Sequence, residues 1–500
     1  YRGRAGIATA IGHAPQVGLA SAEAGSVMAV AESLTNIVWA PLADGLNSVS
    51  LSANWMWPCR SQAGEDARLY AGVKALSDFC CALHINVPTG KDSLSMTQQY
   101  PDGKKIIAPG TVIVSAGGEV SDVRRVVRPV VVNDPASRLY YIDFSSAPLA
   151  LGGSAFAQTL GRVGSDVPTV ADAEAFRRAF AAVQKLVSQE LLLAGHDVSA
   201  GGLVTTLLEM CFANTKGGLE LSLDALSPAS DFAHTLFAEN PAVVVQVADA
   251  HNEAFSAVLA EAGVAAVELG RPVEGRTLTL RRADRQLALD IDALREDWYG
   301  TSAEMDTFQS FHGCAEQRAH NYKSQPLHFR LPASFDGSFA TLGVSPDRRT
   351  PSGVRAAIIR EKGTNGEREM AYILHLAGFD VKDVTMTDLV SGRETLDEVN
   401  FIVFCGGFSN SDVLGSAKGW AGAFLFNPKA KAALDRFYAR PDTLSLGVCN
   451  GCQLMVELGL VNPEHTDRRA RMLHNDSHKF ESGFVGVDVA PNDTVLFSSL

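Results

Sequence analysis

The sequence has few cysteines, an excess of acidic over basic residues and no long apolar run. Eight cysteines in 500 residues are too few for a disulfide scaffold, so we expect a reduced, cytoplasmic protein. No run of about 18 apolar residues predicts a membrane-spanning helix, and the first residues lack a signal-peptide pattern. Lys and Arg (43) are outnumbered by Asp and Glu (56), which argues against nucleic acid or an anionic membrane as a partner.

Length and composition indicate a globular chain of several domains. Five hundred residues exceed the roughly 250–300 that one core supports. Strand and helix patterns mix irregularly up to about residue 295, which is typical of an α+β fold, whereas strand–helix units repeat from Val354 onward. Such repetition predicts a doubly wound parallel sheet. We therefore predict subdomains at 1–132 and 136–295, a linker at 296–350, and an α/β domain at 351–500.

Several local elements follow from apolar periodicity and from breaking residues. The expectations that matter below are a helix over Ala22–Ala40, a strand over Val126–Val132, a loop over His196–Gly202, a helix over Trp298–Ala319, a helix over Glu367–Leu376 capped by Asn365, and strands over Phe401–Phe404 and Leu444–Val448. The chain starts at Tyr1 rather than Met and ends inside an apolar pattern. We therefore expect an internal piece of a longer protein.

The strongest chemical motif lies at residues 447–451, which read Gly-Val-Cys-Asn-Gly between a predicted strand and a predicted helix. A nucleophile on such a tight turn has a strained backbone, and flanking glycines relieve the crowding. A helix N-terminus also favours the thiolate, which is the attacking form of Cys449. The N–H groups of Asn450 and Gly407 could then stabilise a developing oxyanion.

Other interpretations of Cys449 remain open at this point. Cys449 and Cys452 could form a redox pair, although nothing nearby has a compact thioredoxin pattern. A zinc site would need two more ligands at matched spacing, and the sequence offers no second Cys pair. Cys449 could also be a buried structural cysteine, because cysteine is among the most buried residue types.

Longer phrases carry a family resemblance. The order of a strand, Gly406–Ser409, about forty residues and the Cys449 turn resembles the triad-type glutamine amidotransferases. The phrases at Arg360–Ala371, Gly419–Ala421 and Leu446–Gln453 resemble the long single-chain phosphoribosylformylglycinamidine synthase family, also called formylglycinamide ribonucleotide amidotransferases. Upstream phrases resemble the second synthetase-like half of that family; they are Ala31–Asn36, Ser52–Met56, Gly64–Ala67, Gly90–Met96 and His196–Leu203.

One segment departs from that family pattern. Residues 237–241 read Phe-Ala-Glu-Asn-Pro where the family more usually has Glu-Glu-Leu-Gly. We interpret this departure as a local variation at the entry to a strand.

The resemblance implies a fold and an activity. It implies an aminoimidazole-ribonucleotide-synthetase-like α+β domain followed by a flavodoxin-like glutaminase domain. The activity implied is a C–N ligase of purine biosynthesis, which uses glutamine and ATP to convert formylglycinamide ribonucleotide into its amidine. It also implies an upstream synthetase-like half before Tyr1, and the His and Glu of the triad beyond Leu500.

A second set of site residues lies upstream. Glu32 and Asn36 are four residues apart, so they share one helix face. By themselves they indicate a solvated polar face, and Asp197 in a loop indicates a turn or cap residue. The resemblance implies instead that Glu32, Asn36 and Asp197 bind Mg²⁺ and that Ser199 contacts ATP or ADP. Whether that nucleotide is spent is left open, because the family can hold it as a structural ligand.

Two rival functions belong to other classes. One is a stand-alone cysteine hydrolase or peptidase with an attached binding domain. The other is a non-catalytic scaffold that binds a nucleotide.

Overall fold

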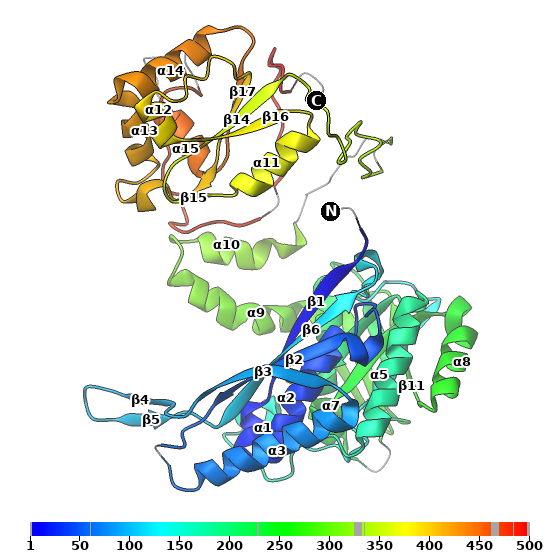
Figure 1. Cartoon of the computed structure of the whole chain (residues 1–500). Helices are drawn as coiled ribbons and strands as arrows, with labels where there is room; N and C mark the ends of the chain where they lie inside the picture. Colours follow the sequence, from blue (N-terminus) through cyan, green and yellow to red (C-terminus); the bar gives the residue numbers. More distant parts are fainter. Residues whose placement is uncertain are drawn as a thin grey trace. The chain divides into compact units, whose positions relative to one another are not determined.

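The structure is a computed structural model of the chain (Figure 1). It describes residues 3–60, 62–227, 230–324, 333–334, 336–461, 470–483 and 485–497. The chain divides into two compact units, Tyr1–Ala303 and Glu304–Leu500. Among the described residues, every helix is too short or too polar to cross a bilayer.

The first unit contains a four-stranded sheet in the order β1-β6-β2-β3. Its strands are β1 (Gly6–His13), β2 (Val49–Met56), β3 (Asn86–Ser93) and β6 (Thr111–Val120). Only the β2–β3 pair is parallel. Helices α2 (Ala22–Ile37) and α3 (Glu65–Leu83) contribute to the same apolar core as alternate residues of β2 and β6. A short helix α1 (Pro15–Ala20) precedes α2, and a hairpin of β4 (Thr97–Gln99) and β5 (Lys105–Ile107) extends away from the sheet (Figure 1).

The second sheet of this unit has seven strands in the order β13-β12-β9-β11-β7-β10-β8. Its strands are β7 (Ser137–Asp143), β8 (Ala194–Val198), β9 (Gly218–Ser222), β10 (Ala242–Ala248), β11 (Val267–Val273), β12 (Thr277–Arg282) and β13 (Arg285–Asp290). Alternate residues of β10 enter two different cores, because successive side chains of a strand point to opposite faces. One core includes α5 (Ala173–Ser188) and α8 (Asn252–Ala262), and the other includes α6 (Gly202–Phe212).

The predicted strand over Val126–Val132 is wrong, because this segment has no regular ladder. Its backbone groups bond to several different partners instead. The N–H of Val127 donates to Trp39, and the N–H of Val131 donates to Met210. Val132 exchanges two hydrogen bonds with the side chain of Gln246, so the segment is an irregular connector in which only Val131 is buried.

Two further predictions, one of a helix and one of a loop, are wrong in part. The expected helix over Trp298–Ala319 is two helices, α9 (Ile291–Thr307) and α10 (Cys314–His320). The segment His196–Val198 belongs to strand β8 rather than to a loop, since it pairs with β10. The sequence-based domain limits stay predictions, and residues 325–332 and 335 of the expected linker lie outside the described part of the chain.

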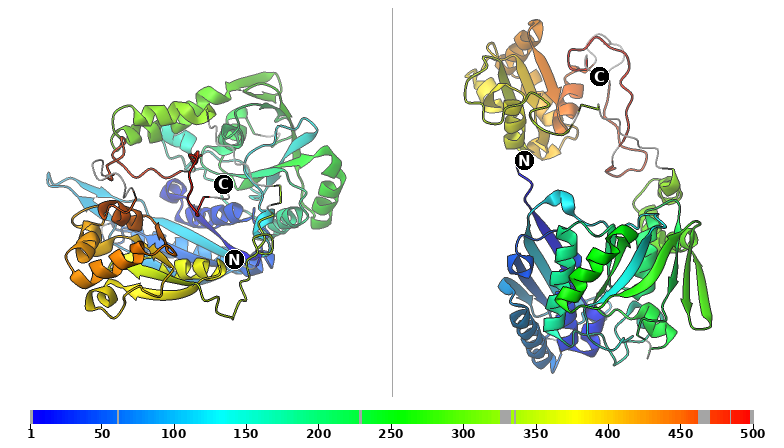
Figure 2. Two further views of the ribbon diagram at one scale, coloured as in Figure 1. Left: turned by 90° about the horizontal axis from the view of Figure 1, so that it is seen from above. Right: turned by 90° about the vertical axis from the view of Figure 1, so that its right-hand side faces the viewer.

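The second unit contains a four-stranded parallel sheet, as the repeated strand–helix pattern predicted. Its order is β16 (Asp380–Thr385), β14 (Arg355–Arg360), β17 (Phe401–Phe404) and β19 (Leu444–Gly447). Helix α11 (Glu367–Leu376) packs on one face. Helices α12 (Met386–Ser391), α13 (Lys418–Leu425), α14 (Pro428–Ala439) and α15 (Asn450–Glu457) share the core of the other face. Figure 2 shows these helices, yellow to orange, on both sides of the sheet.

The expected cap of α11 is wrong by one residue. Gly366, with φ +81°, is the N-cap residue, and its left-handed backbone suits glycine. Asn365 lies instead in the two-residue strand β15 (Thr364–Asn365), which pairs with β18 (Gly406–Gly407). The pairing connects the start of α11 to the loop that follows β17.

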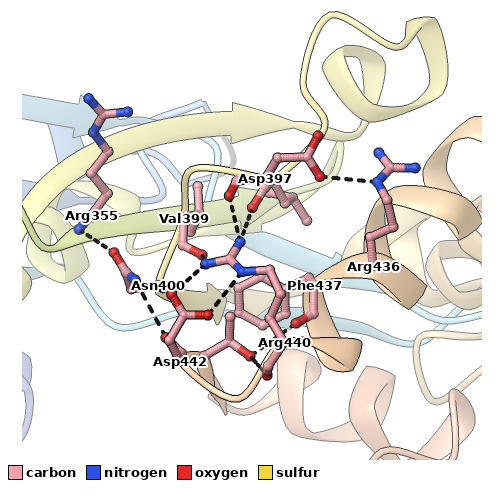
Figure 3. A network of polar contacts seen from close by, with 10 residues as sticks. Arg355, Asp397, Val399, Asn400, Arg436, Phe437, Arg440 and Asp442 are labelled. Atoms are coloured by element: carbon pink, nitrogen blue, oxygen red, sulfur yellow. Dashed lines mark hydrogen bonds and ion pairs between the residues drawn. The ribbon is translucent and has the colours of Figure 1, made fainter.

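An arginine clamp joins the amino ends of β17 and β19 (Figure 3). The guanidinium of Arg440 donates to the carbonyl oxygens of Leu396, Asp397 and Val399 at 2.7–3.0 Å. It also forms a two-point ion pair with Asp442. The loops before the two strands are therefore fastened to one side chain.

We expect the substitution Arg440→Ala to destabilise the second unit. Three backbone carbonyls would lose a charged donor, which should lower the free energy of unfolding by about 2 kcal/mol. Calorimetry of the full-length protein should then show an earlier transition for this unit. Arg436 is the matched control, because it makes one exposed ion pair with Asp397 and its removal should change little. Equal losses of stability in the two variants would contradict the proposal that Arg440 stabilises this unit.

Candidate functional sites

Cys449 stands on a sharp turn between β19 and α15. Its backbone has φ +54° and ψ −112°, which is a strained conformation for a residue with a side chain. It is the N-cap residue of α15, so its position is set by the strand before it and the helix after it. This is the strand–turn–helix geometry that the glycine spacing predicted.

The glycines around Cys449 are required by close packing. A Cβ atom at Gly447 would lie 2.6 Å from the carbonyl oxygen of Gly451. A Cβ atom at Gly451 would overlap the carbonyl oxygen of Phe404 at the end of the neighbouring strand. Both contacts are with backbone, which cannot move aside as a flexible side chain could. No residue larger than glycine therefore fits at either of these two positions.

The thiol of Cys449 is exposed and lies beside the paired glycines of β18. A Cβ atom added to Gly406 would lie 3.7 Å from Sγ of Cys449. The interpretation of Cys449 as a buried structural cysteine is therefore wrong. All eight cysteines are free, and no group of three His, Cys, Asp or Glu side chains in the described residues could hold a metal.

Of the predicted oxyanion residues, Asn450 follows Cys449 directly, and Gly407 follows Gly406, which lies beside the thiol. The N–H of Asn450 is at the first position of α15, where the helix supplies no acceptor. Gly407 has φ +110°, and a Cβ atom there would lie 2.8 Å from backbone atoms of Gly363 and Asn365. Only glycine therefore fits this loop. The assignment of Asn450 and Gly407 to an oxyanion hole stays a prediction.

The side chain of Asn450 has a structural part that the sequence did not reveal. Its Oδ1 atom accepts hydrogen bonds from the N–H and hydroxyl of Ser409, at 3.1 and 2.6 Å. Its Nδ2 atom donates to Gln453 at 2.8 Å. Asn450 thereby fastens the loop after β17 to the first turn of α15, and so sets the distance between the two glycine-rich turns.

Two of the upstream residues, Glu32 and Ser199, line a separate pocket in the first unit. It lies between α2, the end of β1 and the turn after β8; its lining includes His13, Val17, Met28, Glu32, Thr35, Gly153, Ser199 and Glu239. Glu32 reaches it from α2, where Oε2 accepts the backbone N–H of His13 at 2.9 Å. The structure therefore brings Glu32 and Ser199 to one pocket.

The electrostatics of this pocket are set by several acidic groups. Burial raises the pKa of Glu32 from 4.5 to about 7. The hydrogen bond from His13 opposes that rise, and the carboxylates of Asp197 and Glu239 add to it. A nearby cation would relieve this repulsion, and a hard divalent ion prefers carboxylate oxygens of this kind.

The other two predicted metal ligands do not line the pocket. Asp197 is buried in β8 and only 5% exposed, and its Oδ1 lies 3.4 Å from Nδ1 of His196. Asn36 is exposed one turn beyond Glu32, and its Nδ2 donates to the carbonyl of Ile11 at 3.3 Å. That bond leaves the amide oxygen of Asn36 as the atom suited to a cation. The assignment of Glu32, Asn36 and Asp197 to Mg²⁺ stays a prediction.

The raised pKa of Glu32 predicts a pH dependence. The folded state favours the protonated carboxyl of Glu32 over the ionised one. The contribution of this group to the stability is therefore complete below pH 4.5 and is lost as the pH rises through about 7. Without divalent cations, the melting temperature of the first unit should therefore fall over this range, and Mg²⁺ should restore it above pH 7. The substitution Glu32→Gln should flatten the curve. Glu23→Gln, on the exposed side of α2, is the control and should not.

Glu239 is a residue of the pocket that sequence reasoning missed. Its carboxylate accepts the backbone N–H groups of Ala155 and Gly201, both at 2.7 Å. The only signal was the departure of residues 237–241 from the family pattern. The segment leads directly into β10, as the interpretation of this departure as a strand-entry variation expected, and it also contributes Glu239 and Pro241 to the lining of the pocket.

Comparison with known proteins identifies three consecutive domains. The FGAR-AT PurM_N-like domain matches residues 1–119. The C-terminal domain of AIR synthase related proteins matches residues 142–282. The CobB/CobQ-like glutamine amidotransferase domain matches residues 353–500. Together with the sheets described above, these matches confirm the predicted fold class.

Curated relatives match nearly the whole chain, and a solved structure aligns with part of it. Phosphoribosylformylglycinamidine synthase of Homo sapiens is 39% identical over 99% of this chain and 38% of its own length. That of Dictyostelium discoideum is 34% identical over 100% of this chain and 39% of its own. Thermotoga maritima PurL complexed with FGAR aligns at 13% identity and a TM-score of 0.48, over 58% of this chain and 46% of that one.

The recognition made from the sequence is confirmed by the relatives, which match the chain from end to end. The chain spans between 35% and 39% of their length. The chain is thus related along its whole length to the phosphoribosylformylglycinamidine synthase family, and it corresponds to a little over a third of the length of these relatives.

Proposed function

We propose that the chain is part of a glutamine-dependent ligase that converts formylglycinamide ribonucleotide into formylglycinamidine ribonucleotide. The observation that carries the proposal is the exposed thiol of Cys449, on a strained turn beside Gly406 and at the start of a helix. A cysteine that only packs in the fold would not require the strained backbone conformation of Cys449. A nucleophile needs exposure, a fixed direction and nearby donors.

In the glutaminase step, the thiolate of Cys449 attacks the side-chain carbonyl carbon of glutamine. The N–H groups of Asn450 and Gly407 stabilise the oxyanion of the tetrahedral intermediate. Ammonia leaves after its nitrogen takes a proton from the protonated triad His, which acts here as a general acid, and a thioester with Cys449 remains. Water then hydrolyses the thioester and releases glutamate.

The first unit supplies a pocket for ATP or ADP in this proposal. Ser199 would contact the nucleotide there, and Glu32 would hold Mg²⁺, with Asn36 and Asp197 as the further predicted ligands. The ion would neutralise phosphate charge in a pocket that is otherwise acidic. The eight free cysteines favour a reducing compartment, and we assign the protein to the cytoplasm.

The test is an assay of the full-length protein with glutamine, formylglycinamide ribonucleotide and Mg·ATP. We expect glutamate, ADP, phosphate and the amidine product in equal amounts. A second arm uses the glutamine analogue 6-diazo-5-oxo-norleucine, which should alkylate Cys449 in a peptide map. Glutamate release that needs no ATP and is accompanied by no amidine product would favour a stand-alone hydrolase. Nucleotide binding without any turnover would favour a scaffold.

A further inference from the structure

Glu239 joins two chain segments that are far apart in sequence. One N–H that it accepts belongs to Ala155, the first residue of α4 (Ala155–Thr159). The other belongs to Gly201, the N-cap residue of α6, two residues after Ser199. Both bonds end on the same oxygen, Oε1, at 2.7 Å. One carboxylate therefore fixes the spacing of two walls of the pocket.

The residues beside Glu239 strengthen the same connection. Asn240 is almost fully buried; its Oδ1 accepts the N–H of Ala150, and its Nδ2 donates to the carbonyl of Pro148. The ring of Phe237 stacks on Phe156 with 4.6 Å between centroids. The loop that leads into α4 is thus held at several points by residues 237–240.

The turn that carries Ser199 rests on the same segment. Gly202 has φ +72°, and a Cβ atom there would lie 2.7 Å from backbone atoms of Leu236 and Phe237. The backbone at Gly202 therefore cannot shift toward Leu236 and Phe237. The position of the turn therefore depends on the backbone just before Glu239 and on the hydrogen bond from Gly201.

We propose that Glu239 is a positioning residue of the nucleotide pocket: its carboxylate holds the Ser199 turn and the α4 loop at the separation that a phosphate group with a divalent cation requires. This inference rests on the proposed nucleotide site. Glu239 acts as an acceptor rather than as a metal ligand, since its Oε1 already receives two N–H donors.

An acceptor role and a charge role predict different behaviour on substitution. The amide oxygen of Gln can accept the same two N–H groups, whereas Leu can accept neither. In the full-length protein, Glu239→Gln should therefore bind Mg·ADP within about threefold of the wild type, and Glu239→Leu should bind at least about tenfold more weakly. Glu261→Leu, on an exposed side chain of α8, is the control and should leave the affinity unchanged.

A ligand-free measurement tests the geometry separately from the ligand. Amide hydrogen exchange should become faster in residues 150–156 and 199–203 of Glu239→Leu, and stay near wild type in Glu239→Gln. Equal weakening of Mg·ADP binding by both substitutions would overturn the acceptor role, and so would unchanged exchange in Glu239→Leu. Absence of Mg·ADP binding to the wild type would overturn the nucleotide assignment, while the exchange data would still show whether Glu239 holds the two loops.

Discussion

Replacing Cys449 by alanine should abolish glutamine-dependent product formation by the full-length protein, with a loss of about a thousandfold or more. Alanine removes the only atom that attacks glutamine in the proposed step. Synthesis from added ammonium chloride should continue near the wild-type rate, because ammonia bypasses the glutaminase site. Parallel assays with glutamine and with ammonium chloride provide the measurement.

Cys452 gives the matched control. It lies three residues further along the chain in α15, is partly buried and is also free. The substitution Cys452→Ala should leave both activities within about twofold, because no proposed step uses that thiol. Unchanged glutamine-dependent turnover in Cys449→Ala would eliminate Cys449 as the nucleophile. Equal losses in both variants would favour a redox pair.

The substitution Gly451→Ala should be nearly as damaging, although it adds one methyl group. The new Cβ would collide with the carbonyl oxygen of Phe404, so β17 and the first turn of α15 must separate. We expect a loss of more than about 3 kcal/mol in stability of the second unit, because backbone offers no cheap relaxation. Calorimetry should show an earlier transition, and glutaminase activity should fall with it.

Gly422 in α13 is the contrasting position. A Cβ atom there meets only the ring of Phe426 at 3.7 Å, which is ordinary contact. Because glycine is unfavourable inside a helix, Gly422→Ala should raise the stability by about 0.5–1 kcal/mol. If the two alanine substitutions had similar effects, the packing account of the turn at Cys449 would fail.

The turn at Cys449 was predictable because its requirements are local. A glycine two positions before and two positions after a cysteine, between a strand and a helix, is enough to specify the geometry. The buried strand Phe401–Phe404 was predicted for a similar reason, since an uninterrupted apolar run between breakers has few alternatives.

The features that sequence reasoning missed depend on distant partners. Asn450 bonds to Ser409, 41 residues away, and Glu239 bonds to Ala155, 84 residues away. Val126–Val132 has strong strand propensity, but its N–H groups find acceptors on a helix, a side chain and a connector. The apolar periodicity of a sequence does not encode hydrogen bonds between distant residues, so these pairings depend on the tertiary fold.

The arginine clamp and Cys449, the proposed nucleophile, lie at opposite ends of one parallel sheet. Arg440 binds the loops that enter β17 and β19, whereas Gly406 and Cys449 follow the same two strands where they leave the sheet. An engineer could therefore exchange the loops at the exit end to seek a new amide substrate and leave the fastening at the entry end untouched.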